Sequence, residues 1–177
     1  GKGAAAHEAE DPLNRPDYAA SASMIVSLQK ALELNDLQVS DLDHLELYSC
    51  FPVVPKLARR VLGIPASTQM TVFGGLTFGG GPIGNYMTHA AASMVEALRR
   101  GGTNGFLFAN GGYATHNHSI ALTKTPQPEG TFPHNFDYQS EADAMRGETP
   151  AMQLEHSGPA NLETYTVLFD RTGKPKQ

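Results

Sequence analysis

The sequence predicts a layered α/β domain, in which helices pack on a mixed β-sheet. Two observations support this class. Three stretches repeat apolar residues at three- and four-residue steps, as one face of an α-helix does, and short apolar runs of strand length alternate with them. The last two strand patterns are joined by a short glycine-bearing return, which favours antiparallel pairing between them.

Each element is placed by its own pattern and by the residues that punctuate it. In chain order the predicted elements are a helix capped by Asp17 and broken by Asn35 and Asp36, a strand over 44–48, a helix over 53–62 stopped by Gly63, a strand over 70–73, a helix over 86–100 capped by Asn85, a strand over 105–109 and a strand over 119–124. Residues 73–84 carry so many glycines that we expect a loop without regular structure.

The two ends of the chain show weaker patterns. Residues 1–16 are small and acidic, and we expect them to be loop or disordered, so that the first strand of a β-α-β-α-β-α-β-β unit is missing. The chain opens Gly-Lys-Gly without a methionine, which indicates an excised piece. Residues 126–160 predict an extended linker. Residues 162–170 predict a strand, and 161–177 would then open a truncated additional β domain.

Composition excludes several classes of function. The chain has 177 residues and a net charge of −5, which argues against nucleic acid as a partner because phosphate binding needs a basic face. No apolar run approaches the length that spans a bilayer, and no basic-then-apolar leader is present, so we expect a cytoplasmic protein without membrane contact. The single cysteine, Cys50, excludes a disulfide framework and a Cys-rich zinc site.

The glycine-rich segment is the strongest local feature, and it leaves three interpretations. Gly79, Gly81 and Gly84 match the dinucleotide-binding pattern, but the loop is too long for that turn and no acidic residue follows at the distance that holds a ribose. A flexible surface loop is the second interpretation. A loop whose bare backbone approaches a ligand is the interpretation we favour.

Cys50 and two histidines are the candidate reactive groups. Cys50 follows a strand end, where it is either a small buried apolar residue or a thiol for nucleophilic or acid/base work, which requires an environment that lowers its pKa. His116 and His118 alternate around Asn117 and would face one side of a strand. A metal ion needs at least a third ligand, and none is suitably spaced, so we predict no metal site.

Three motifs in order resemble the C-terminal half of a thiolase. They are Tyr48-Ser49-Cys50-Phe51, the segment from Gly74 to Gly84 with Gly80-Gly81-Pro82, and Ala109-Asn110-Gly111-Gly112. The resemblance covers residues 17–125 and is closest to the sterol-carrier-protein-type thiolases and to thiolase-like proteins with an additional C-terminal domain. It implies a layered fold of two similar halves, of which the N-terminal half is absent from this chain, and a homodimer.

The resemblance also implies roles for single residues. In these thiolases the first motif reads His-Asp-Cys-Phe, so Cys50 would take part in acid/base chemistry. The loop motif Gly-His-Pro here has Gly81 in place of its histidine, and the motif Cys-x-Gly has Ala109 in place of its cysteine. Gly111 keeps the amide of an oxyanion hole. The substrate-binding positions would be Phe51, Gly80, Gly81, Asn110, Gly111 and Gly112, and Tyr48, Tyr113, His116 or His118 could supply further acid/base groups.

Three functions follow as expectations from the resemblance. The first is a thiolase-type acyl-CoA acyltransferase, with a CoA thioester as substrate, no bound cofactor, and a fragment that is inactive alone. The second is a catalytically impaired protein that binds acyl-CoA, and the third is a retro-aldol lyase acting on a CoA thioester. Loss of the loop histidine removes a base and an oxyanion donor, which favours the last two, whereas retention of Cys50 favours the first. In each case Cys50, Gly81 and Gly111 should converge on one cleft.

Overall fold

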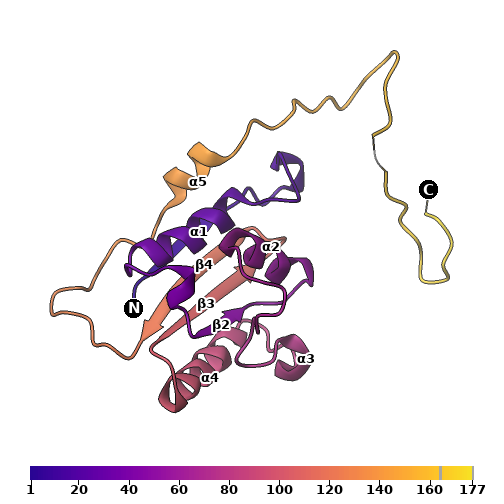
Figure 1. Ribbon diagram of the computed structural model, residues 1–177. Coiled ribbons are helices and arrows are strands. Elements are labelled where there is room, and N and C mark those ends of the chain that lie inside the picture. The colour runs from indigo at the N-terminus through magenta and orange to yellow at the C-terminus, as the bar shows by residue number, and fades with distance from the viewer. Residues whose placement is uncertain (164, 177) are drawn as a thin grey trace.

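A four-stranded mixed sheet lies at the centre of the protein, as the computed structural model shows (Figure 1). The structure describes residues 1–163 and 165–176. The strands are β1 (Gly3–His7), β2 (His44–Leu47), β3 (Asn104–Gly111) and β4 (His116–Thr123), in the spatial order β1-β4-β3-β2. The β2–β3 pair is parallel, whereas β3–β4 and β4–β1 are antiparallel. The predicted mixed sheet and the predicted antiparallel closing pair are confirmed.

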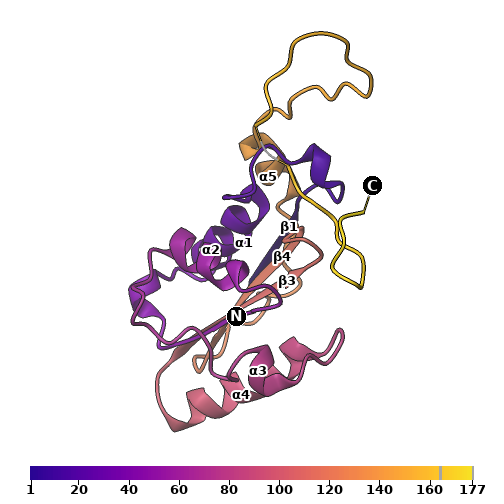
Figure 2. The ribbon, with the colours of Figure 1, turned by 90° about the vertical axis from the view of Figure 1, so that its right-hand side faces the viewer.

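Helices cover the sheet on both faces (Figure 2). Helices α1 (Ala22–Glu33) and α2 (Val53–Leu62) form one layer, and α4 (Tyr86–Arg100) with the short α3 (Leu76–Gly79) forms the other. Alternate residues of each strand pack against the two helix layers, because successive side chains of a strand point to opposite faces. Phe106 and Phe108 pack beneath α1 and α2, while Leu107 packs against Met94 of α4.

The helix boundaries follow local capping chemistry. Helix α1 begins at Ala22 rather than after Asp17, because Ser21 is its N-cap and accepts a hydrogen bond from the backbone N–H of Met24 at 3.1 Å. The carboxylate of Asp17 instead accepts from the N–H of Ala19 in a local turn. Helix α2 ends at Gly63, whose φ of 65° supplies the left-handed stop that the sequence predicts.

Strand β1 corrects the prediction that the first strand is missing and that residues 1–16 are loop. It pairs with β4 so that Ala5 lies opposite His118. Glycine and alanine make up most of the strand, so it carries no alternation of large apolar and polar residues that a sequence pattern could register. Its small side chains let α1 approach closely, and the Ser27 hydroxyl of α1 donates to the carbonyl of Ala4 at 3.1 Å.

The segment after α2 departs from its prediction in two ways. Residues 70–73 form no strand: the Met70 carbonyl accepts from the N–H of Leu47, but the N–H groups of Val72 and Phe73 donate to the buried carboxylate of Glu46 at 2.9 and 3.0 Å. The glycine-rich segment, expected to lack regular structure, contains helix α3. The carboxylate of Glu46 therefore accepts backbone hydrogen bonds that a neighbouring strand would otherwise accept.

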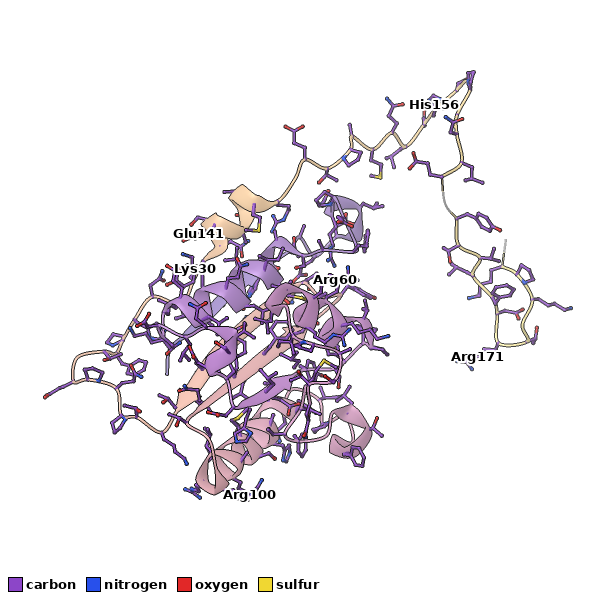
Figure 3. The ribbon with its side chains drawn as sticks, viewed as in Figure 1. Lys30, Arg60, Arg100, Glu141, His156 and Arg171 are labelled. Carbon is purple, nitrogen blue, oxygen red and sulfur yellow. The ribbon has the colours of Figure 1, made fainter. Side chains whose placement is uncertain are left out.

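The predicted linker over 126–160 is partly folded onto the domain. The N–H of Ala5 donates to the carbonyl of Phe136 at 2.7 Å, and α5 (Gln139–Met145) packs against α1. Figure 3 shows Glu141 of α5 beside Lys30 of α1, whose amine also lies over the Tyr138 ring at 5.7 Å. Helix α5 consists mainly of polar residues and buries one alanine, Ala142, so the sequence shows no apolar stripe that would predict it.

Residues 150–163 and 165–176 run away from the layered body in an extended path (Figure 1). The strand predicted over 162–170 is wrong for the residues of that range that the structure describes, in which a single bridge between Phe169 and Pro175 is present. Residue 164 lies outside the described residues. A further β domain opening at 161 stays a prediction.

A buried ion pair ties α5 to the start of α1. The Glu8 carboxylate is 7% exposed and accepts from the Nε of Arg146 at 2.8 Å and from the N–H of Ser23 at 2.8 Å. Burial opposes ionisation, but hydrogen bonds from Ser23, Ser21 and Arg146 outweigh it and hold the pKa of Glu8 below its usual range. Residues 1–16 and 137–146 are therefore part of one folded unit.

We predict that Arg146→Ala lowers the free energy of unfolding by roughly 3 kcal/mol, because it leaves the Glu8 carboxylate buried without its counterion. Denaturant unfolding followed by circular dichroism measures the change. Arg171→Ala is the control, since Arg171 lies on the exposed C-terminal segment (Figure 3). Equal stability of the two variants would show that α5 is not part of the cooperative unit.

Candidate functional site

Two parallel strand ends bring Cys50 and Asn110 together. Cys50 lies three residues beyond the end of β2, and Asn110 is next to last in the neighbouring β3. Because β2 and β3 are parallel, their carboxyl ends share one edge of the sheet. The Cys50 thiol donates to Oδ1 of Asn110 at 3.4 Å. Two of the three motifs singled out in the sequence thus meet at this edge.

A directed chain of hydrogen bonds runs from this thiol into the domain. Nδ2 of Asn110 donates to Oδ1 of Asn117 at 2.9 Å, and Nδ2 of Asn117 donates to the Ser23 hydroxyl at 2.7 Å. That hydroxyl donates to Glu8 at 3.0 Å. A carboxylate with lowered pKa can only accept, so it fixes the direction of each donor before it. The Cys50 thiol is the first donor of the chain.

Backbone carbonyls lock the two amide groups in the same orientation. Nδ2 of Asn117 also donates to the carbonyl of Ala114 at 3.1 Å, and Nδ2 of Asn110 also reaches the carbonyl of His116 at 3.4 Å. Oδ1 of Asn110, an acceptor, therefore faces Cys50. A thiolate there would meet the negative end of this amide dipole, so the geometry favours the protonated thiol.

The pKa of Cys50 moves in the corresponding direction. Burial raises the pKa of the half-buried thiol, and the nearby backbone N–H groups of Phe51 and Cys50 offset this only in part. Nucleophilic work requires an environment that lowers the pKa of a cysteine. The structure provides the opposite, so in this chain Cys50 is a neutral thiol at pH 7 and a donor.

The predicted histidines lie on the other face of the sheet. His116 and His118 do face one side, as their alternation predicts, but Asn117 between them points toward α1 and Cys50. They join His7 of β1, whose Nε2 lies 2.9 Å from Nε2 of His118, and His116 lies 3.2 Å from Glu10. Neither histidine is therefore placed to assist Cys50. Sequence analysis missed His7 because it missed β1.

The Tyr48 ring packs on the α4 side of the sheet, although Cys50 still acts on its hydroxyl electrostatically. Its ring packs on Tyr86 of α4 with centroids 4.9 Å apart, and burial raises the pKa of its hydroxyl. Tyr86 in turn donates to Glu46 at 2.7 Å, and its own pKa is raised by burial and then by that carboxylate. Tyr48 remains a predicted acid/base group, on the α4 side of the sheet.

The glycine-rich segment is attached at its beginning and open at its tip. Ser49, next to Cys50, accepts from the N–H of Leu76 at 3.3 Å, which joins the segment to the candidate site. Gly80 and Gly81 have φ values of 71° and 62°, and a Cβ added to either would meet no atom within 4 Å. The predicted approach of Gly81 to Cys50 stays a prediction, as do the substrate-binding roles of both glycines.

Phe51 lines an aromatic cavity beside the thiol. Its ring lies 6.5 Å from that of Tyr113, which follows Gly111 and Gly112 in the β3–β4 turn. The cavity holds about 220 Å³ and is lined mainly by apolar and aromatic groups, with Val54 and Leu57 of α2 among them. Arg15 and Tyr18 complete the wall. No sequence pattern indicated these two residues, because they lie in irregular segments before α1.

Two further findings concern the described residues. Within 1–163 and 165–176, no three His, Cys, Asp or Glu side chains are grouped so that they could hold a metal ion. Over the same ranges, none of the helices combines the length and hydropathy that crossing a membrane requires.

Comparison with solved proteins defines the class of the fold. A monomeric SCP2-thiolase like protein type 1 from Mycobacterium smegmatis matches with a TM-score of 0.77 and 26% identity, over 88% of this chain and 35% of that one. Human mitochondrial 3-ketoacyl-CoA thiolase matches with a TM-score of 0.56 and 21% identity, over 70% of this chain and 29% of that one, a likeness of fold alone. No family model and no curated protein matches the sequence.

The chain therefore has a thiolase-like fold, as its motifs predicted. It spans 35% of the length of the first of these solved proteins and 29% of the second.

We predict that Cys50 reacts slowly with iodoacetamide at pH 7, and that its rate rises with an apparent pKa above the value of about 8.5 of a free cysteine. It is the one cysteine of the chain, so the pH–rate profile reports this thiol alone. The same chain in urea is the control and should show the ordinary value. Fast alkylation of the folded protein at pH 7 would contradict the donor assignment.

We predict that His118 titrates below about 6.5, the usual value of histidine, in an NMR pH titration. Burial lowers the pKa of His118, and His7 and His116 lower it further. The pKa of His118 is lower in the folded than in the unfolded protein. Its contribution to the free energy of unfolding is therefore fully present above pH 6.5 and is lost as the pH falls below that value. His7→Gln should move the titration of His118 upward; no movement would exclude coupling between the two rings.

Proposed function

We propose that this chain forms the C-terminal part of an acyl-CoA-binding site in a thiolase-like protein, with Cys50 as a neutral thiol whose S–H turns from Asn110 to the thioester oxygen when the ester binds. One observation supports the assignment above all: the thiol begins a hydrogen-bond chain that ends on the Glu8 carboxylate. The two solved proteins with this fold are named as thiolase or thiolase-like, one of them as a 3-ketoacyl-CoA thiolase, which supports a CoA thioester as the ligand.

Acyl transfer by this chain alone is disfavoured by its residues. The reaction needs a thiolate that holds the acyl group and a base that forms a carbanion. Cys50 is held protonated, and Gly81 and Ala109 stand where the family has a histidine and a second cysteine. Transfer would require a nucleophile from an N-terminal thiolase half. The chain's own contribution is binding and polarisation of the thioester.

An uncovered part of the sheet supports such a partner half. Helix α4 covers β2 and β3, whereas β1 and β4 on the same face border an open apolar cavity of about 320 Å³. Its lining includes Ala5, Ile120 and Met87, and Ile120 is 38% exposed. A sheet face of this kind is normally packed against another element. We propose that an N-terminal half of the same protein covers it, in a cytoplasmic protein that pairs as a homodimer.

Isothermal titration with acetyl-CoA tests the proposal. We expect binding, with affinity weakened about ten-fold by Cys50→Ala, because the variant removes the donor to the thioester oxygen. Cys50→Ser retains a donor and should retain most of the affinity. Phe169→Ala, on the extended C-terminal segment, is the control and should bind as the parent does. Absence of any heat with acetyl-CoA at millimolar concentration would refute the proposal.

A further inference from the structure

Arg15 is a buried cation in the wall of the aromatic cavity beside Cys50. The residue is 8% exposed, and one of its guanidinium N–H groups donates to the backbone carbonyl of Tyr113. Its guanidinium carbon lies 5.1 Å from the centre of the Tyr18 ring. Among residues 1–163 and 165–176, no carboxylate lies within ion-pair distance of Arg15. Arg15 therefore contacts a backbone carbonyl and the face of an aromatic ring, and neither group carries a negative charge.

Such a cation is costly to bury unless an anion compensates it. Guanidinium groups stay protonated at every physiological pH and carry five donors, of which the Tyr113 carbonyl engages one. Among the described residues, none that lines the cavity is acidic, so these residues offer the positive charge no neutralisation. A carboxylate fits this donor arrangement, because it can accept two parallel N–H groups of one guanidinium.

The size and the lining of the cavity indicate what kind of molecule would carry this carboxylate. Its volume of about 220 Å³ is below the range usual for drug-sized ligands, so it admits a short group and not a long fatty chain. Phe51, Val54 and Leu57 offer aliphatic and aromatic contacts along its length. The cavity therefore combines one cationic group with mainly apolar and aromatic walls.

We propose that this cavity is a subsite for a short acyl group that ends in a carboxylate, with Arg15 as its counterion. This inference rests on the proposed thioester function and adds a substrate class to it: acyl-CoA esters of short dicarboxylic acids. Cys50 packs against the core cluster that contains Val54 and Leu57 of the cavity lining, so a thioester at the thiol would have its acyl chain close to the cavity.

The test compares two CoA esters that differ at the far end of the acyl chain. Adipoyl-CoA ends in a carboxylate and hexanoyl-CoA ends in a methyl group. By calorimetry the full chain should bind adipoyl-CoA about ten-fold more tightly, in line with the strength of a charge-assisted hydrogen bond. Arg15→Gln should abolish this ratio, and Arg15→Lys should keep part of it. Equal affinity of the parent chain for both esters would overturn the inference without any variant.

A second measurement separates this subsite from the thioester function. Titration with free hexanoate and its neutral analogue hexanamide, followed by NMR shifts of the Phe51 and Tyr113 rings, needs no CoA. Hexanoate should shift both rings and hexanamide should not. If both CoA esters fail to bind while hexanoate still shifts the rings, the thioester proposal fails and the anion subsite stands. If neither acid nor amide shifts them, Arg15 only fastens the Tyr113 turn, and the inference is wrong.

Discussion

The buried carboxylate of Glu8 determines the orientation of the polar groups that end at Cys50. An ionised carboxylate accepts hydrogen bonds and donates none, so Ser23 must donate to it, Asn117 must donate to Ser23, and Asn110 must donate to Asn117. The thiol is left to donate at the outer end. The chemistry available at the sheet edge therefore depends on a carboxylate at the N-terminal end of α1, where Arg146 at the end of α5 supplies the countercharge.

A second buried carboxylate performs a comparable task on the opposite face. Glu46 is fully buried and gathers the Tyr86 hydroxyl, the Thr71 hydroxyl and the N–H groups of Val72 and Phe73. These contacts fix the beginning of the glycine-rich segment against α4, while its tip at Gly80 and Gly81 is left open. Two acidic residues that show no pattern in the sequence thus position the Cys50–Asn110 pair and the beginning of the glycine-rich segment.

Periodic elements could be predicted from the sequence, and elements that depend on tertiary contacts could not. The apolar stripes of α1, α2 and α4 and the apolar β3 were evident, because each buries large side chains at regular steps. Strand β1 and helix α5 were not, because small or polar residues form them and their partners are far away in the chain. The thiolase-like fold was predicted from three short motifs in their order along the chain, and the solved proteins with this fold confirm it.

Only part of the candidate site could be predicted from the sequence, for the same reason. Cys50, Phe51 and Asn110 were indicated by the motifs, and the common side of His116 and His118 followed from strand alternation. That these histidines lie across the sheet from Cys50 depends on the register between β3 and β4, which no local pattern contains. Arg15 gave no signal, since a single arginine in an irregular segment is ordinarily solvated.

The central claim is that Cys50 is a protonated donor held by Asn110, and the infrared S–H stretch of this single cysteine tests it most directly. At neutral pH the account predicts a narrow band at lower frequency than that of a free thiol, and Asn110→Ala should move the band back toward the free-thiol frequency. Absence of an S–H band at neutral pH would mean that the sulfur is a thiolate, and a band that is unaffected by Asn110→Ala would mean that the hydrogen bond does not exist. Either result would contradict the account.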